Sequence, residues 1–367
     1  MKVSNNMNKA LLHTVWQIAD EFLRPRAGEA DRGGVDGPVA DNIRRLGEAG
    51  LFGLGITPEY GGLGADETTR HEYAEILASA CGVTAFTQQQ LQTGIKLVTE
   101  AENEALKREL LPALASGGLR CGVALSHLRR SGTPLVRANR VAGGYTLNGV
   151  IPWITGWALL DGFALGAALE GGDHLFVYVD KEQCGASLSA SAPLPLVVMA
   201  ASDTVEAEVR DLFIPDEYVL ARRPGEALRR ADENTITTHA ALPLGCARAS
   251  ARYLREMASQ PGREALGQTA FALTLEIDGC RREALTWCDC AAHPDYKTHA
   301  LRARATANVL ALRAAYATVI ATGGRAHLVT SVPQRLVREA QFYGTAVQMP
   351  DVQASTLDQL ISPFFGL

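Results

Sequence analysis

Trp153 and Thr155 stand two residues apart in residues 143–156, and an extended chain would project both side chains from the same face of a sheet. Gly143-Gly144 reads as a tight hairpin turn, a strand starts at Tyr145, and Asn148-Gly149 reads as a second turn that accepts positive φ. An indole beside a hydroxyl offers a surface on which a flat, hydrogen-bonding ring could rest. The alternative is a core tryptophan with a cross-strand threonine.

The composition excludes some classes of protein. Of the 367 residues 47% are hydrophobic and 20% are charged, so the chain can bury a sizeable core, and its length favours two or three domains. The net charge of −5 argues against a general nucleic-acid binder, which usually carries a basic face.

The cysteines do not form a ligand pattern. There are 7 of them, scattered, with no CxxC or Cys/His spacing, so no metal site is expected and they read as apolar fillers in a reducing compartment. The N-terminus lacks the layout of a signal peptide, and no apolar run reaches the length of a membrane span. We expect a soluble, cytoplasmic protein that does not act at a membrane.

The elements that must position these residues follow from the hydrophobic periodicity. Helical spacing predicts a helix over residues 8–23, ended by Pro25 and the glycines that follow it, and further helices up to about residue 115. Residues 50–64 hold too many glycines for a helix or regular strand and should form a surface loop. Short alternating runs from residue 118 to Pro215 indicate antiparallel sheet, and long helices return after Gly225. Ser331 is expected to cap the helix that follows it, with Pro333 in the first turn.

Four ordered segments resemble the acyl-CoA dehydrogenase family of flavoproteins. They are GLFGLGITPEYGGLG (50–64), ASGGLRCGVALS (115–126), LNGVIPWITG (147–156) and ATGGRAHLVTSVPQRLVREA (321–340). The resemblance implies an α+β multidomain fold: an N-terminal helical domain (1–117), a middle antiparallel β-domain (118–216) and a C-terminal four-helix bundle (225–367).

The resemblance also implies a flavin site. In the family, the Trp and Thr matched by Trp153 and Thr155 pack against the isoalloxazine ring and hydrogen-bond its reactive nitrogen, and a hydroxyl matched by Ser126 meets the pyrimidine edge. Gly323 and Gly324 would let the backbone approach the adenine half, unless they are an ordinary helix C-cap. Arg263, in REALG, is a candidate for the pyrophosphate. We therefore expect FAD, with FMN possible.

The residue that usually removes the substrate's α-proton is missing. The family's catalytic glutamate corresponds to Val347, and valine cannot take a proton. Relatives that place the base on an earlier helix would place it at Thr235, where Asp232 and Glu233 are the nearest acids. Glu233 is a candidate displaced base, and the alternative is a first-turn acid that complements the helix dipole.

Three functions remain open. The first is an oxidoreductase that acts on CH–CH donors in an acyl thioester or related small substrate, with an atypical base. The second is a monooxygenase using reduced flavin and oxygen, in which His327 could take part, although a solvated loop histidine is the simpler interpretation. The third is a non-catalytic relative.

Further expectations concern the substrate loop and the partners. The loop that contacts the thioester in the family is here HLRRSGTPL (127–135), which is bulkier and more basic and keeps Ser131 and Thr133 as hydroxyl contacts. The resemblance implies a homodimer or homotetramer, and the electron acceptor stays open.

Overall fold

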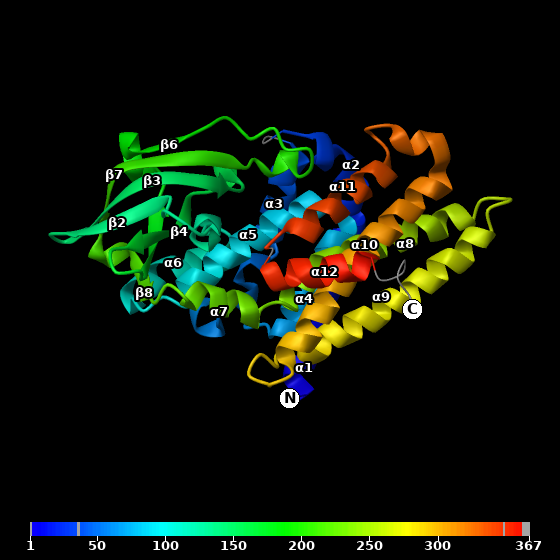
Figure 1. Ribbon diagram of the computed structural model, residues 1–367, viewed down its shortest axis with the longest axis horizontal. Coiled ribbons are helices and arrows are strands. Elements are labelled where there is room, and N and C mark those ends of the chain that lie inside the picture. The colour runs from blue at the N-terminus through cyan, green and yellow to red at the C-terminus, as the bar shows by residue number, and fades with distance from the viewer. Residues whose placement is uncertain (1, 35–36, 348, 362–367) are drawn as a thin grey trace.

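The computed structural model describes residues 2–34, 37–347 and 349–361. N-terminal helices, a sheet and C-terminal helices follow one another along the chain. In space the sheet lies at one end of the molecule, beside the helices (Figure 1). The predicted fold class is confirmed.

The N-terminal part is all helical. Its helices are α1 (Lys2–Ile18), α2 (Arg24–Arg32), α3 (Pro38–Glu48), α4 (Glu67–Ala80), α5 (Gly82–Thr99) and α6 (Glu104–Ser116). The prediction that Pro25 ends the first helix is wrong: a π-helical turn, Ala19–Leu23, joins α1 to α2, and Pro25 lies in the first turn of α2. Proline is tolerated there because the first N–H groups of a helix need no partner within it.

Residues 50–64 are more compact than the predicted surface loop. They form short 3-10 helices, Leu51–Gly55 and Pro58–Tyr60, and the side chains of Phe52 and Ile56 are buried in the core. Gly50, Gly61 and Gly64 have positive φ, as the sequence predicts.

The central sheet is mixed. Its strands are β1 (Cys121–Ala124), β2 (Val136–Val141), β3 (Gly144–Ile154), β4 (Gly162–Leu169), β5 (His174–Asp180), β6 (Leu188–Ala190), β7 (Val205–Pro215) and β8 (Val219–Arg223). They are ordered β6-β7-β3-β2-β4-β5-β8, with β1 paired to β4. Most pairs are antiparallel, as predicted, but β1 and β2 each pair with β4 in parallel.

Two details at the edges of this sheet differ from the sequence prediction. Strand β8 extends the sheet to Arg223, past residue 216. Asn148-Gly149 is not a turn: it is an irregularity within β3, where the register against β7 shifts and Gly149 takes φ 142°. An added Cβ at Gly149 would lie 1.9 Å from the Leu135 carbonyl, so the close approach of β2 requires glycine there.

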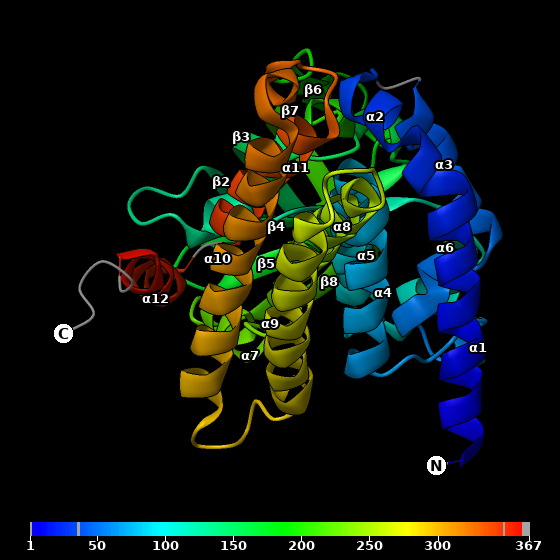
Figure 2. The same ribbon diagram turned by 90° about the vertical axis from the view of Figure 1, so that its right-hand side faces the viewer.

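The C-terminal part is helical again. Its helices are α7 (Ala227–Asn234), α8 (Ala241–Ala258), α9 (Ala265–Trp287), α10 (Tyr296–Thr322), α11 (Val332–Thr345) and α12 (Pro350–Ile361). Helices α8 to α11 pack together as the bundle (Figure 2). The Ser331 side chain accepts from the Gln334 N–H, which confirms the predicted cap.

Residues 296–327 contain an 18-residue window with a mean hydropathy of 1.2, so by length and composition alone this segment could cross a membrane. Among the described residues this is the one such segment. It contains α10, and 44% of the apolar window is buried within the structure. Core helices of soluble bundles have the same composition, so the apolar character of α10 is explained by its packing on α8, α9 and α11.

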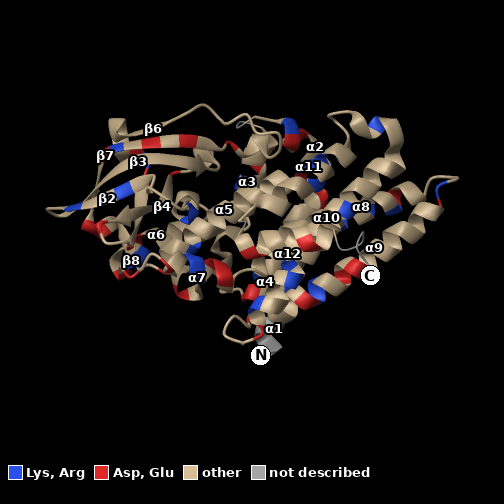
Figure 3. Ribbon diagram, in the orientation of Figure 1, with Lys and Arg blue, Asp and Glu red and all other residues tan. Residues whose placement is uncertain are grey.

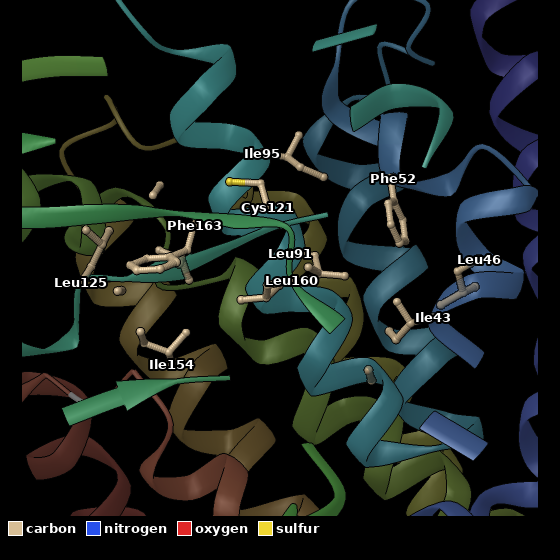
Figure 4. Close-up of a cluster of buried hydrophobic side chains, with 14 of the residues drawn as sticks. Ile43, Leu46, Phe52, Leu91, Ile95, Cys121, Leu125, Ile154, Leu160 and Phe163 are labelled. Atoms are coloured by element: carbon tan, nitrogen blue, oxygen red, sulfur yellow. The ribbon is translucent and has the colours of Figure 1, made fainter. Parts of the chain in front are cut away.

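One continuous core joins the N-terminal helices to the sheet. Leu91 and Ile95 of α5 face Cys121 of β1 and Phe163 of β4 across it (Figure 4). The contact is close because α5 presents Gly94, where an added Cβ would lie 2.2 Å from the Gly122 carbonyl. The α5–β1 contact therefore fixes the helices against the strand that leads directly to Ser126.

Candidate functional site

Trp153 and Thr155 lie at the end of β3 and differ in exposure. Trp153 is 41% exposed, whereas Thr155, one residue past the strand, is 7% exposed. The register against β7 shifts between Ile151 and Ile154, and such irregularities re-aim side chains at sheet ends. The exposure of Trp153 argues against the core-tryptophan alternative.

A loop that the sequence analysis missed holds the Thr155 hydroxyl. Thr155 Oγ1 lies 3.0 Å from Thr204 Oγ1, which lies 2.8 Å from Ser202 Oγ. The N–H of Gly156 donates to the Ser202 carbonyl at 2.8 Å, and Asp203 Oδ2 accepts from the Ala158 N–H at 2.6 Å. The only sequence signal was the polar run Ser202-Asp203-Thr204, which has no spacing that links it to Thr155.

Ser126 has a buried hydroxyl that lacks a hydrogen-bond partner among the described residues. It begins the 3-10 turn Ser126–Arg129, which follows β1 and contacts β3. Buried polar atoms nearly always have a partner, so the Ser126 hydroxyl is available to one from outside the chain. The next residue, His127, is instead anchored, with Nε2 2.7 Å from the Gly166 carbonyl, and burial lowers the pKa of its imidazole.

The loop 127–135 is tied to α7 by an ion pair. Arg129 donates from Nε and Nη2 to the two carboxylate oxygens of Asp232 at 2.7 and 2.8 Å. This bidentate pair occupies both oxygens, so Asp232 is not available as a proton acceptor unless the pair opens. Ser131 and Thr133 are exposed, farther along the same loop.

Glu233 faces away from Asp232. Its carboxylate accepts from Arg229 Nη1 at 2.6 Å and lies 4.0 Å from Lys297 Nζ. The expectation of a first-turn acid is wrong, because Glu233 lies in the last turn of α7. The helix ends there because the Thr235 hydroxyl turns back and donates to the Ala231 carbonyl at 3.0 Å.

Val347 follows the end of α11 and is half-buried, with φ 46°. A β-branched residue is strained in this left-handed region. Beneath it, Arg304 of α10 donates from Nη2 to the carbonyls of Tyr343 and Ala346 at 2.9 and 3.1 Å. The position that holds the base in the resembling family therefore has an arginine beside it and no carboxylate of its own.

His239 is a site residue that the sequence analysis missed. It lies in the 3-10 turn Thr238–Ala240, with Nδ1 3.4 Å from Gln89 Nε2 of α5. Desolvation, reinforced by the positive charge of Arg304 and then of Arg129 and Lys96, lowers the pKa of His239 to about 3. The ring is therefore neutral at physiological pH and is a weak base. No periodicity or motif marks His239. Its environment depends on Gln89 of α5 and Arg304 of α10, which are far from it in the sequence.

Arg263 lies between α8 and α9, and Gly323 and Gly324 follow the end of α10. The α8–α9 connection and the end of α10 lie on the opposite side of the molecule from the sheet (Figure 1). Arg263 Nη1 donates to the Ala321 carbonyl at 3.1 Å. Gly323 has φ 69° and is the C-cap of α10, and its N–H donates to the Val319 carbonyl. Added Cβ atoms at Gly323 and Gly324 would meet open space, so another molecule can approach this backbone. His327, in the same turn, is exposed.

The structure thus places the predicted residues in two separate regions. Ser126 lies on a turn that contacts β3, the strand that ends at Trp153 and Thr155, and Arg263 contacts the end of α10 next to the glycine pair. Among the described residues, no three His, Cys, Asp or Glu side chains gather closely enough to hold a metal ion.

Comparisons with known proteins agree with this architecture. A family model described as the acyl-CoA dehydrogenase N-terminal domain matches residues 5–118. The mitochondrial isovaleryl-CoA dehydrogenase of Solanum tuberosum is 27% identical over 59% of this chain and 54% of its own length. The benzylmalonyl-CoA dehydrogenase of Aromatoleum aromaticum is 25% identical over 66% of this chain and 65% of its own. The chain thus matches about half to two thirds of the length of these relatives.

Solved structures match over nearly the whole chain. Butyryl-CoA dehydrogenase from Megasphaera elsdenii superposes with a TM-score of 0.83 at 20% identity, covering 97% of this chain and 98% of that one. A glutaryl-CoA dehydrogenase in complex with glutaryl-CoA gives a TM-score of 0.81 over 96% of this chain and 95% of its own, also at 20% identity. Residues 5–118 of this chain thus match the acyl-CoA dehydrogenase N-terminal domain, and nearly the whole chain has the fold of an acyl-CoA dehydrogenase.

Proposed function

We propose that the protein is an FAD-dependent oxidoreductase that acts on CH–CH bonds of an acyl thioester or related small substrate. The observation that supports it most directly is the group at the end of β3. The exposed indole of Trp153, the buried hydroxyl of Thr155 and the unpartnered hydroxyl of Ser126 come from neighbouring segments. These are an apolar platform and two polar contacts, which is what a planar heteroaromatic ring requires.

These residues fit the flavin that the family uses. Trp153 would pack against the ring, Thr155 would hydrogen-bond at its reactive nitrogen, and Ser126 would meet the pyrimidine edge. When bound, a flavin would supply the acceptor for a hydride, which carries two electrons and one proton. The hydroxyl of Thr155 can donate toward that acceptor while Thr204 donates to it in turn, since each hydroxyl both donates and accepts.

The second group favours FAD over FMN. Arg263 and the glycine pair present a cation and accessible backbone, which suit a pyrophosphate and an adenine, and FMN lacks both. Because the α8–α9 connection and the end of α10 lie on the opposite side of the molecule from the sheet, we infer that a single copy would not bring both groups to one cofactor. A homodimer or homotetramer, in which one copy supplies Arg263 to its partner's flavin, accounts for the separation.

A monooxygenase that uses reduced flavin and oxygen is the second candidate, and the missing base favours it. Val347 has no proton-accepting group, Asp232 is bound to Arg129, and the pKa of His239 is about 3. Oxygen transfer would not need any of them to remove an α-proton. The third candidate, a relative that binds flavin weakly or an acyl ligand only and has no activity, predicts a protein without colour.

The remaining parts of the proposal concern setting and partners. Basic and acidic side chains are interspersed along the helices in the view of Figure 3, as expected for a protein with a net charge of −5 that binds a small molecule rather than nucleic acid. We propose a cytoplasmic location away from membranes, with the electron acceptor open.

The test begins with the visible spectrum of the purified protein after loading with FAD or FMN. Acyl-CoA thioesters are then supplied with an artificial electron acceptor, and in parallel reduced flavin is supplied with oxygen. Reduction of the acceptor supports the dehydrogenase. An oxygen-dependent hydroxylated product supports the monooxygenase instead, and a protein that cannot be loaded with either flavin contradicts both.

A further inference from the structure

Arg304 is a buried cation that has no carboxylate partner in the part of the chain that the structure describes. Its side chain is 3% exposed, and its hydrogen bonds to the described residues go from Nη2 to the carbonyls of Tyr343 and Ala346. A guanidinium carries five N–H donors, so Nε and Nη1 are left without a described partner. Arg335, the other buried arginine among the described residues, has Glu339 at 2.8 Å. Both arginines are cations, but only Arg335 has a carboxylate partner among the described residues.

The other two cations that act on His239 already have carboxylate partners. Arg129 is paired with Asp232, and Lys96 lies 3.7 Å from Glu100. The end of α11 offsets part of the charge on Arg304, because helix C-terminal carbonyls carry about half a negative charge. The rest of the positive charge on Arg304 is unpaired among the described residues. Burying such a charge costs free energy of folding unless an anion binds to it.

The surroundings of Arg304 suit a small planar anion. His239 and Gln89 face each other at 3.4 Å on the side of α5, and both are half-buried. Phe86 and Phe342 meet edge to face with centroids 4.6 Å apart and are also half-buried, so polar and apolar walls border the same region. Val347, where the family places a carboxylate, follows the residue whose carbonyl Arg304 holds. Residues 2–34, 37–347 and 349–361 thus keep a cation at this place and supply no carboxylate to it.

We propose that the substrate's acyl group itself carries a carboxylate, which Arg304 binds together with His239 and Gln89. This inference rests on the proposed function, since it places the acyl chain in the same site. A carboxylate matches the site because the guanidinium, imidazole and amide present donors to two coplanar oxygens. It also explains why the interior can hold an unpaired charge, because the partner arrives with the substrate.

The experiment compares thioesters of equal length that differ only in a terminal carboxylate. The FAD-loaded protein is titrated calorimetrically with succinyl-, glutaryl- and adipyl-CoA and with the matched butyryl-, pentanoyl- and hexanoyl-CoA. We expect the carboxylated member of at least one pair to bind about 10- to 100-fold more tightly, because a hydrogen bond to a charged group changes the affinity by about that factor. Equal affinity within every pair overturns the inference and leaves the proposed function standing.

Variants at Arg304 locate the effect. Arg304→Gln removes the charge, but its amide can still donate to the carbonyls of α11, and it should abolish the preference for the carboxylated thioester. Arg304→Lys keeps the charge and should restore part of the preference. If Arg304→Gln does not fold, His239→Leu leaves the α11 contacts intact and should reduce the preference about 3- to 10-fold. A preference that survives these changes contradicts the assignment.

Two further outcomes distinguish a carboxylate site from a general anion site, and failure of the inference from failure of the proposed function. Inorganic phosphate is titrated alone, and if it binds as tightly as the carboxylated thioester and depends on Arg304, the site is a general anion site and the carboxylate assignment is wrong. If a flavin-loaded protein binds neither member of any pair, the proposed acyl-thioester function fails together with the inference.

Discussion

The hydroxyl of Thr155 lies 3.0 Å from the hydroxyl of Thr204, so the loop before β7 positions the group expected to face the flavin. Thr155→Val keeps the side-chain volume and deletes the donor, and we expect a shifted flavin spectrum or potential with the fold intact. Thr204→Val is the matched control, because it breaks the same hydroxyl contact and leaves the Thr155 hydroxyl in place. If the two variants shift the spectrum equally, or neither does, Thr155 does not contact the ring.

Trp153→Ala should lower flavin occupancy, because it removes a 41%-exposed indole expected to stack on the ring. The loss should be about 1 to 3 kcal/mol of binding free energy, the range of aromatic truncations. Flavin retention after gel filtration measures it. Trp16→Ala is a control with a similarly exposed indole, at 38%, on α1. Equal retention in both variants would refute the stacking assignment.

Val347→Glu should create dehydrogenase activity if the scaffold still aligns flavin and thioester. A positioned base contributes about 10²- to 10⁴-fold, and the neighbouring Arg304 favours the ionised carboxylate. The measurement is the rate at which a saturated acyl-CoA bleaches the flavin, and Val347→Gln is the control that lacks the base. Rapid bleaching by the unmodified protein would show that another acid serves, and Glu233→Gln and Asp232→Asn would then identify it.

The stability of the protein should fall in mild acid because of His71. This residue of α4 is 0% exposed with both ring nitrogens unpartnered among the described residues, and burial followed by the charge of Arg281 lowers its pKa from 6.5 to about 3. Between those pH values the unfolded chain binds a proton that the folded chain does not, so lowering the pH favours unfolding. The contribution is about 2 kcal/mol between pH 7 and pH 5.

Urea unfolding at pH 7 and pH 5 tests this, with His71→Leu as the comparison. The variant should lose less free energy of unfolding than the unmodified protein over this interval, since the other acid-sensitive groups are common to both. Identical losses in the two proteins would show that His71 is not the group responsible.

Self-association should depend on an apolar face formed by the start of α9 and the end of α10. Its side chains are more than half exposed: Phe271, Leu275, Tyr316 and Ile320. The pairs stand four residues apart on each helix, so they share a face, and Arg263 lies at the same end. We expect Phe271→Asp with Ile320→Asp to give monomers by light scattering and to weaken FAD binding. Phe213→Asp, at a 50%-exposed position on β7, should leave the assembly unchanged. A monomeric unmodified protein at micromolar concentration would contradict the prediction.

The sequence by itself determined the order of the three parts and most of the elements. Helical and alternating periodicities separate the helices from the sheet because they report which face is buried, and the Ser331 cap and the positive φ of Gly50 and Gly61 follow from local backbone chemistry. The resemblance named the residues at the end of β3, and the structure brings Trp153, Thr155 and Ser126 to neighbouring segments. Pro25 misled the prediction because a π turn, which depends on packing, carries the helix past it.

Only the tertiary structure decided which charges are neutralised. Asp232 and Glu233 are adjacent in the sequence, yet one binds Arg129, 103 residues away, and the other binds Arg229 on its own helix. No pattern in the sequence marks Arg304 or His239. The Arg304 guanidinium reaches the carbonyls next to Val347 only because α10 packs against α11. Burial and pairing are properties of segments that meet in space, and periodicity along one segment does not contain them.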